Sequence, residues 1–393
     1  MTAPHIQGGK GLTTRAAAAA VLLLGATAAG IALDPQRALW AYHAAFTYWA
    51  GIAVAALILL GSLHATKARW PVVLRRVLEA IPRTLLLFVV LFAPVALGMG
   101  KIFAWVDPKA SGLTGELLHL AHHRHAYLNV PFFLARQVLY FGSWILVGGL
   151  LWRWSVRQDA EKGVALTVSQ RRLGTGALPF LALTMTFAAV DWQESLDLHH
   201  NSTIFGVYYF AGSFLSAVAV LVLCLYALRR EELYRMLNAD HWHALGKLLL
   251  AFTAFWAYIA FSQYMLIWIA NLPEEAPYFI HRTKGPWGMV GAALFVLHFV
   301  VPFFALLSRD LKRNPRTLAL AAAWQLAFHY LDVYYTMFGG LMPEGPRPHW
   351  TDLTALVGLG AAGLAFGAWQ LRRASPVPVG DPYLQDSLRY QPQ

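Results

Sequence analysis

The lysines and arginines of this chain gather on alternate polar segments, and this pattern constrains the fold more than any other feature of the sequence. Ten apolar stretches, each of about 18 residues or more, separate eleven polar segments. The odd-numbered segments hold 23 of the 31 lysines and arginines, whereas the even-numbered segments and adjoining helix ends hold 8. Because short cytoplasmic loops accumulate these residues, the pattern predicts a multi-pass membrane protein with both termini in the cytoplasm.

The expected fold is an all-α integral membrane domain of ten transmembrane helices. Helices are the only open-chain structure whose backbone groups are satisfied within hydrocarbon. Spans 2–5 and 6–9 carry most of the intramembrane polar residues, so we expect two four-helix bundles flanked by spans 1 and 10. To within a few residues, the spans cover about 16–33, 40–63, 82–104, 131–153, 175–193, 203–228, 246–270, 287–307, 316–338 and 352–371.

The two ends of the chain have their own patterns. Lys10 and Arg15 precede an Ala-rich first span, as in a secretory signal, and cleavage there would leave nine spans. A retained helix is favoured, because the apolar run is long for a signal and lacks a clear cleavage site. The last span contains Gly363 and Gly367 in a GxxxG pattern, which permits close helix packing. We expect residues 1–374 to form one membrane domain and residues 375–393 an extended cytoplasmic tail, laid on this or a neighbouring subunit.

Composition excludes several classes of protein. Charged residues make up only 13% of the chain, against about 25% in soluble domains. The net charge of +11 follows from the loop bias rather than from a compact basic stripe, so no nucleic-acid partner is expected. Nucleotide-binding loops and HExxH metalloprotease motifs are absent from the sequence. Membrane lipid is the first expected partner.

A single cysteine, Cys224, limits the redox chemistry of the chain. One thiol cannot hold an iron–sulfur cluster, and no CxxCH motif is present for covalent haem attachment. Iron–sulfur clusters and covalently attached haem are therefore expected only in partner subunits. Cys224 itself, within an apolar run, is interpreted as a small buried hydrophobic residue.

The densest ionisable group closes the fifth span. Asp191 and Glu194 are three residues apart and share a helix face near the outer end. Two close carboxylates suit proton uptake or release. Arg136, near the outer end of the fourth span, is the expected ion-pair partner of one of them. A structural ion pair with interfacial solvation is the alternative.

A second group lies at the midplane. His329 and Asp332 share a face of the ninth span, and His298 in the eighth span is at similar depth: His329 is about 20 Å from the cytoplasmic end of its span and His298 about 18 Å from the outer end of its span. Intramembrane ionisable residues are costly and invite a functional interpretation. Three alternatives remain open at this point: a proton path or quinone-binding group, ligation of a b-type haem by the histidines, and structural histidines with satisfied hydrogen bonds.

Other polar residues complete the set of candidates. In the seventh span, Tyr258, Ser262, Gln263 and Tyr264 are expected to line the bundle, although such residues also join helices without any further role. The longest outer loop carries four histidines. We expect a docking surface there rather than a zinc site, because no acidic or cysteine ligand is suitably spaced. The histidines are His119, His122, His123 and His125.

Several motifs from about residue 130 to the C-terminus resemble the ActF-type membrane subunit of bacterial alternative complex III, within the NrfD/PsrC-like polytopic family. The first 130 residues match only in span pattern. The motifs that carry the resemblance are Asp191-Trp192 with Ser195-Leu196-Asp197, Ser202–Phe214, Asn238–Leu249, Phe255–Tyr264, Ile267–Glu275 and Gly380–Leu388.

The resemblance implies a subunit of a quinol:electron acceptor (cytochrome c) oxidoreductase in the bacterial inner membrane. It implies a sister NrfD-like membrane subunit, with multihaem cytochrome c and iron–sulfur partners on the periplasmic side. The expected role is quinone or quinol binding and proton conduction without a redox centre in this chain. A purely structural anchor is the main alternative, and a secondary transporter is the third. Which quinone is used, and whether it reacts on this subunit, is left open by the sequence.

Overall fold

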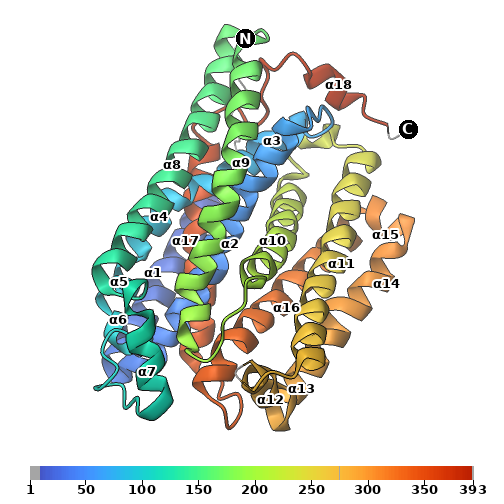
Figure 1. Ribbon diagram of the computed structural model, residues 1–393. Helices are drawn as coiled ribbons and strands as arrows, with labels where there is room; N and C mark the ends of the chain where they lie inside the picture. Colours follow the sequence, from blue (N-terminus) through green and yellow to red (C-terminus); the bar gives the residue numbers. More distant parts are fainter. Residues whose placement is uncertain (1–8, 274, 392–393) are drawn as a thin grey trace.

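The computed structural model describes residues 9–273 and 275–391, and within these ranges the chain is built from helices and contains no strand (Figure 1). Nine helices of the described part are long and apolar enough to cross a membrane, which confirms the class of helical membrane protein expected from the sequence. These nine are Gly11–Leu33, Pro35–Ala65, Val72–Leu97, Val130–Glu161, Ala165–Leu196, Phe205–Leu228, Ala239–Ala270, Gly285–Leu307 and Trp350–Leu371.

The remaining expected span, about 316–338, falls within α16 (Pro315–Leu341), a helix of 27 residues. It is not among the nine apolar helices, because Gln325, His329 and Asp332 reduce its hydropathy. All three side chains are buried inside the protein rather than turned to its surface. The tenth span therefore stays a prediction, although the helix itself is present.

The helices form two groups of four. The first consists of α2 (Pro35–Ala65), the broken helix that begins with α3 (Val72–Arg83), α8 (Val130–Glu161) and α9 (Ala165–Trp192). The second consists of α10 (Phe205–Leu228), α11 (Ala239–Ala270), the pair α13 (Gly285–Leu294) and α14 (Val301–Leu307), and α16. Helices α2 and α10 pack against each other and join the groups (Figure 1).

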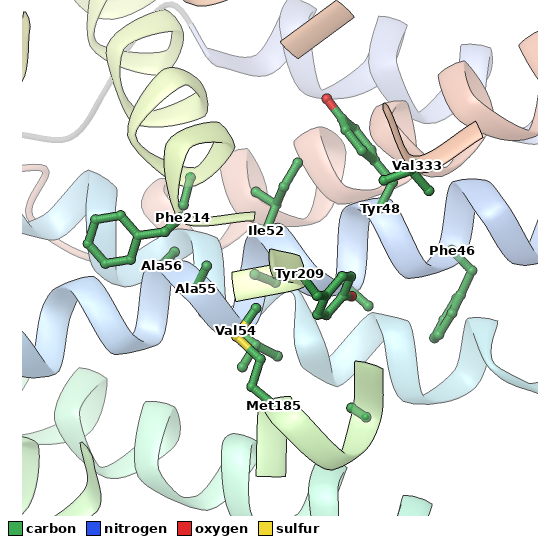
Figure 2. Close-up of a cluster of buried hydrophobic side chains, with 14 of the residues drawn as sticks. Phe46, Tyr48, Ile52, Val54, Ala55, Ala56, Met185, Tyr209, Phe214 and Val333 are labelled. Carbon is green, nitrogen blue, oxygen red and sulfur yellow. The ribbon is translucent and has the colours of Figure 1, made fainter. Parts of the chain in front are cut away.

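Helix α2 is the most deeply buried of the described membrane helices: within its most apolar stretch of 18 residues, 94% are buried inside the protein. Its small residues allow close approach: a Cβ on Gly51 would lie 2.4 Å from the Tyr209 hydroxyl of α10. The same hydroxyl donates to the backbone oxygen of Thr47 at 2.6 Å. Figure 2 shows this junction, where side chains of α2 meet Met185 of α9, Tyr209 of α10 and Val333 of α16.

Helices α1 (Gly9–Leu33) and α17 (Trp350–Leu371) pack as an antiparallel pair beside the first group. Close contact at one end rests on Gly30, where a Cβ would meet Thr351 at 2.5 Å, and further along on Gly358, which faces Leu24. The GxxxG glycines have another neighbour: Gly363 faces Phe88 and Gly367 faces Ala80 and Thr84, so they pack toward α3 and α4 (Leu85–Leu91).

Two membrane helices are interrupted, and proline explains both. The third is divided after Arg83 into α3, α4, α5 (Ala93–Leu97) and α6 (Met99–Ile102), with Pro82 and Pro94 at the breaks. The eighth contains a π-helical turn, Phe295–Val300, just before Pro302. There Val301 N–H bonds to the Val296 oxygen and Pro302 has no N–H, so the Leu297 oxygen is free to accept from Trp324 Nε1 at 2.6 Å.

The C-terminal tail packs on this chain. Asp381 pairs with Arg75 at 2.8 Å, and the Ser387 hydroxyl donates to the Trp70 oxygen at 2.6 Å. Tyr234, in the segment between α10 and α11, donates to the Pro376 oxygen at 3.0 Å. A Cβ on Gly380 would overlap the Gln158 oxygen at 1.8 Å, so only glycine fits at that crossing. The tail thus brings the odd-numbered, Lys/Arg-rich segments together at one end of the molecule, which we call the basic end.

The even-numbered segments meet at the opposite end. Arg37 pairs with Asp352 there, and Trp40 Nε1 donates to the Lys101 oxygen at 3.1 Å. Arg124 likewise donates to the backbone oxygen of His200 at 3.2 Å. The alternation seen in the sequence therefore corresponds to the two ends of the helix groups, and we call this second end the outer end.

Candidate functional site

His298, His329 and Asp332 meet inside the second helix group, and none is more than 2% exposed. The imidazole rings of His298 and His329 lie 6.1 Å apart between centroids and are nearly parallel, at 18°. His329 Nδ1 is 3.6 Å from Asp332 Oδ2, across one turn of α16. The structure thus brings together three residues that the sequence placed at one depth on two helices.

Local backbone features make room for these rings. A Cβ on Gly212 of α10 would lie 2.2 Å from His329 Cε1, so the glycine creates the space that the imidazole occupies. His298 belongs to the π-helical turn, where the extra residue per turn rotates the following side chains. Such turns occur frequently at functional sites.

Asp332 is held by two donors from neighbouring helices. The Tyr208 hydroxyl of α10 donates to Oδ1, and Trp256 Nε1 of α11 donates to Oδ2 at 3.0 Å. Trp256 also contacts His298 edge to face, with ring centroids 4.2 Å apart. All four helical elements of the second group therefore contribute to one polar cluster, defined here as the His–Asp cluster: Tyr208, Trp256, His298, His329 and Asp332.

The histidines of the His–Asp cluster lack hydrogen-bond partners. Among the described residues, neither ring nitrogen of His298 nor of His329 is bonded, although both side chains are buried. Gln325, one turn before His329, donates to Thr253 at 2.7 Å, and its side chain lies beside His298 without meeting the geometry of a hydrogen bond. Buried polar atoms rarely go unpaired, because each costs about 1–3 kcal/mol. The cluster therefore has the chemistry of a site that exchanges protons or holds water or a ligand.

The same residues can be tested against a metal and a haem. Two imidazoles and a carboxylate, with donor atoms within 4.8 Å of one another, form a set that divalent metals accept. A haem does not fit, because two axial histidines point at the iron from opposite faces of the macrocycle. Here the two rings are stacked side by side and packed against Trp256 and Tyr48.

Asp191 forms a separate and fully paired site in the first helix group. Arg136 binds its carboxylate with two hydrogen bonds, at 2.9 Å from Nε and 2.7 Å from Nη2. Gln137 and Tyr140 donate to the same carboxylate at 3.2 and 3.0 Å. The guanidinium also stacks on Tyr127, 3.8 Å from the ring centroid. Asp191 is thus saturated by donors and has the character of a structural ion pair.

Glu194 lies apart from Asp191, beyond the end of α9. Its carboxylate accepts a backbone hydrogen bond from Ser202 at 2.5 Å, and among the described residues Arg136 pairs with Asp191 and not with Glu194. Glu194 lines a cavity of about 460 Å³ at the outer end, between α9 and α10, together with Arg124, Asn201 and Ser202. The two carboxylates that were expected to share a helix face therefore lie in different environments, Asp191 in a buried ion pair and Glu194 at the wall of a cavity.

Polar side chains lead from this cavity toward the second group. Gln263 donates to the Ser202 hydroxyl at 3.2 Å and lies 3.5 Å from His200 Nε2. His200 is stacked on Tyr278, with ring centroids 3.7 Å apart. Burial lowers the pKa of His200 to about 4, opposed by the nearby Asp197 carboxylate and reinforced by the cations Arg282 and Arg124. His200 is therefore neutral at physiological pH and can accept as well as donate.

The remaining candidates differ in position. Ser262 and Gln263 are buried, whereas Tyr258 is 65% and Tyr264 is 38% exposed on the outer surface of α11, so these tyrosines do not line the bundle. The outer-loop histidines lie on or just after the short helix α7 (Gly115–His123), where His119 and His123 stack at 6.4 Å. No metal-type cluster is found around them in the part of the chain that the structure describes.

Sequence reasoning did not identify two members of the His–Asp cluster as site residues. Tyr208 was one of several hydroxyls in its span, and Trp256 was an aromatic residue among many. Their signal is indirect: a buried Asp332 needs donors beyond His329, and the sequence does not say which residues of the neighbouring helices supply them. Comparison with known proteins adds nothing to this assignment, because no protein-family model and no curated protein sequence matches the chain.

Proposed function

We propose that this chain is a membrane subunit of a respiratory quinol:electron acceptor (cytochrome c) oxidoreductase of the alternative complex III type, with proton conduction through the His–Asp cluster as its own contribution. The proposal includes ten spans, both termini in the cytoplasm, and residence in the bacterial inner membrane. It also includes a sister NrfD-like subunit and periplasmic multihaem cytochrome c and iron–sulfur partners, which would carry every redox centre.

One observation carries the proton-conducting role: two buried histidines without hydrogen-bond partners beside a carboxylate, deep among helices of membrane length. Imidazole can release a proton from one nitrogen and take one up at the other. The Asp332 carboxylate, held by Tyr208 and Trp256, would stabilise protonated His329. In the next step it would accept this proton, which leaves His329 neutral. Ionisable residues placed in this way are typical of proton relays in membrane proteins.

The motif resemblance supports the respiratory assignment, and the polar connection from the outer cavity supports the direction of the path. Glu194, Ser202, Gln263 and His200 extend from the cavity toward Tyr278 at the outer end of the second group. The fully paired Asp191 is left out of the path. Quinone or quinol binding by this subunit remains part of the proposal without assigned residues.

Purification of the tagged protein from its native membrane in mild detergent tests the assignment. Absorption spectra and subunit mass spectrometry should show a co-purifying multihaem cytochrome c and a large iron–sulfur protein. A stable, haem-free protein without partners would contradict the respiratory assignment and favour a transporter.

Substitution of Asp332 by Asn tests the proton-conducting role in the purified complex. We expect the proton-coupled step to slow by about 100-fold, the usual cost of removing a positioned proton donor or acceptor, while assembly is retained. Asp332→Glu should preserve part of the activity, and the exposed Asp310→Asn provides a control with the same charge change. Unchanged proton uptake in vesicles containing Asp332→Asn would leave a structural anchor as the better interpretation.

A further inference from the structure

Arg83 is an arginine without a partner at the surface of the first helix group. It ends α3, is half-buried against α8, and its Nε has no hydrogen-bond partner among the described residues. Its Nη1 lies 3.4 Å from the position of a Cβ on Gly149, so the glycine leaves space for the guanidinium. A poorly hydrated charge without a counterion is costly, which points to an anion from outside the chain.

Two more unpaired arginines lie at the same level. Arg153 of α8 and Arg172 of α9 are exposed and form no hydrogen bond or ion pair with the described residues. Counting residues to the outer ends of their helices, Arg83, Arg153 and Arg172 lie about 28, 34 and 30 Å from that end. Because the hydrocarbon core is about 30 Å thick, all three reach the headgroup level at the basic end.

The three arginines surround one lipid-facing surface of α8. On this helix Leu146, Gly149 and Arg153 fall within about 60° of one another, and Leu146 is 61% exposed. Arg83 lies beside Gly149 on one flank. On the other flank, between α8 and α9, runs a groove of about 330 Å³ whose walls are apolar apart from Arg172 and Ser143. The remaining lining residues are Leu146, Val147, Leu173, Gly176, Ala177 and Phe180.

We propose that this surface is a binding site for an anionic phospholipid of the leaflet at the basic end. Its phosphate would bind Arg83, Arg153 and Arg172, and one acyl chain would occupy the groove between α8 and α9. Guanidinium groups bind phosphate oxygens through paired hydrogen bonds, and basic pockets between membrane helices select anionic headgroups. Trp152 and Trp154, on either side of Arg153, are of the type that lies at the headgroup level. The proposal is independent of the respiratory assignment.

Native mass spectrometry of the delipidated, detergent-solubilised protein tests the site with phosphatidylglycerol and phosphatidylcholine of equal chain length. The wild type should bind phosphatidylglycerol in preference to phosphatidylcholine. The double substitution Arg83→Gln with Arg172→Gln should weaken phosphatidylglycerol binding about 25-fold, taking about fivefold, or 1 kcal/mol, for each arginine. Arg83→Lys with Arg172→Lys should restore part of the affinity and shows that the site tolerates substitution.

The matched control is Arg316→Gln, an exposed arginine at the basic end outside this surface, which should bind phosphatidylglycerol as the wild type does. Inorganic phosphate in place of the lipid should not compete, because it cannot fill the groove. Equal lipid binding by the wild type and the glutamine double variant would overturn the proposal. So would a structure of the native complex in which a carboxylate of a partner subunit pairs with Arg83.

Discussion

At the scale of single residues, the His–Asp cluster depends on a missing side chain. Gly212→Ala would place a methyl group 2.2 Å from His329 Cε1, so the imidazole would have to move away from Asp332. We expect a loss of proton-coupled activity and about 1–3 kcal/mol of destabilisation, the usual cost of overpacking. Proton uptake in vesicles and the apparent Tm measure the two effects. Gly142→Ala, where a Cβ meets nothing within 4 Å, should leave both unchanged.

Substitution of Asp191, the partner of Arg136, should have a different effect from substitution of Asp332. Asp191→Asn leaves the buried guanidinium without its counterion, and breaking such a pair costs about 3–5 kcal/mol. We expect a clear fall in the apparent Tm and in the yield of folded protein, with normal proton uptake by the molecules that fold. A variant that keeps its Tm but loses proton uptake would return Asp191 to the proton path.

His200 should make stability depend on pH. In the unfolded chain a histidine takes up its proton near pH 6.5, whereas burial lowers the pKa of folded His200 to about 4. Between these values the unfolded state binds more protons, so the free energy of unfolding falls as the pH falls from 6.5 toward 4. The apparent Tm of the wild type should therefore drop more between pH 7 and pH 5 than that of His200→Gln. Parallel decreases in the two proteins would contradict this assignment.

At the scale of helices, the π-helical turn has a supporting contact that can be removed. The Leu297 oxygen accepts from Trp324 Nε1 because the turn and Pro302 deprive it of a backbone donor. Trp324→Phe keeps an aromatic ring but removes the indole N–H and leaves this oxygen unpaired, at an expected cost of about 1–3 kcal/mol. A lower apparent Tm would agree with this expectation. Trp369→Phe is the comparison, because the indole N–H of this partly exposed tryptophan of α17 forms no hydrogen bond with the described residues.

The sequence predicts which segments form helices better than where those helices begin and break. The third span was expected to begin near residue 82, but α3 begins at Val72. Its first turns carry Arg75, Arg76 and Glu79, which have the composition of a loop and yet are buried. Arg76 is paired with Glu79 of the same helix at 3.2 Å and with Asp159 of α8 at 3.0 Å. The pairing with Asp159 joins residues far apart in the sequence, which no local pattern predicts.

In the candidate site, too, some features follow from the sequence and others do not. Depth along a helix follows from residue counting, and it placed His298, His329 and Asp332 at one level. Rotation about each helix axis does not follow from counting, so Tyr258 and Tyr264 were expected inside the bundle and lie outside it. Arg136 pairs with Asp191 and not with Glu194 because α9 ends between them. Glu194 lies in the short 3-10 turn that follows the helix, so the two carboxylates no longer share a helix face.

At the scale of the whole molecule, the tail holds the basic end together. Removing residues 375–393 would expose Arg75 and Arg76, which lose Asp381 and the Ser375 oxygen as partners. It would also break the hydrogen bond from Asn238 to the Tyr390 oxygen, 2.9 Å long. We expect the shortened chain to insert normally but to unfold at a lower temperature and to be cut by proteases in the segment between α10 and α11. Limited proteolysis of vesicles oriented so that the basic end faces the protease measures this cleavage.

A single substitution tests the contribution of the Arg75–Asp381 ion pair apart from the other contacts of the tail. Asp381→Asn removes one charge while the other tail contacts remain, so it should give an intermediate effect, whereas the exposed Asp386→Asn should give almost none. If the full deletion leaves both the unfolding temperature and the protease pattern unchanged, the tail does not support the fold.

The position of the tail also has a consequence for biogenesis. Membrane helices enter the bilayer in the order of synthesis, yet the first turns of α3 around Arg75 and the last turn of α8 receive their last partners from residues 375–391, which follow every described membrane helix. In a chain released before the tail is made, Arg75 and Arg76 keep Glu79 and Asp159 as partners but lack Asp381 and the Ser375 oxygen. Docking of the tail is therefore the last step that completes the polar contacts of the basic end.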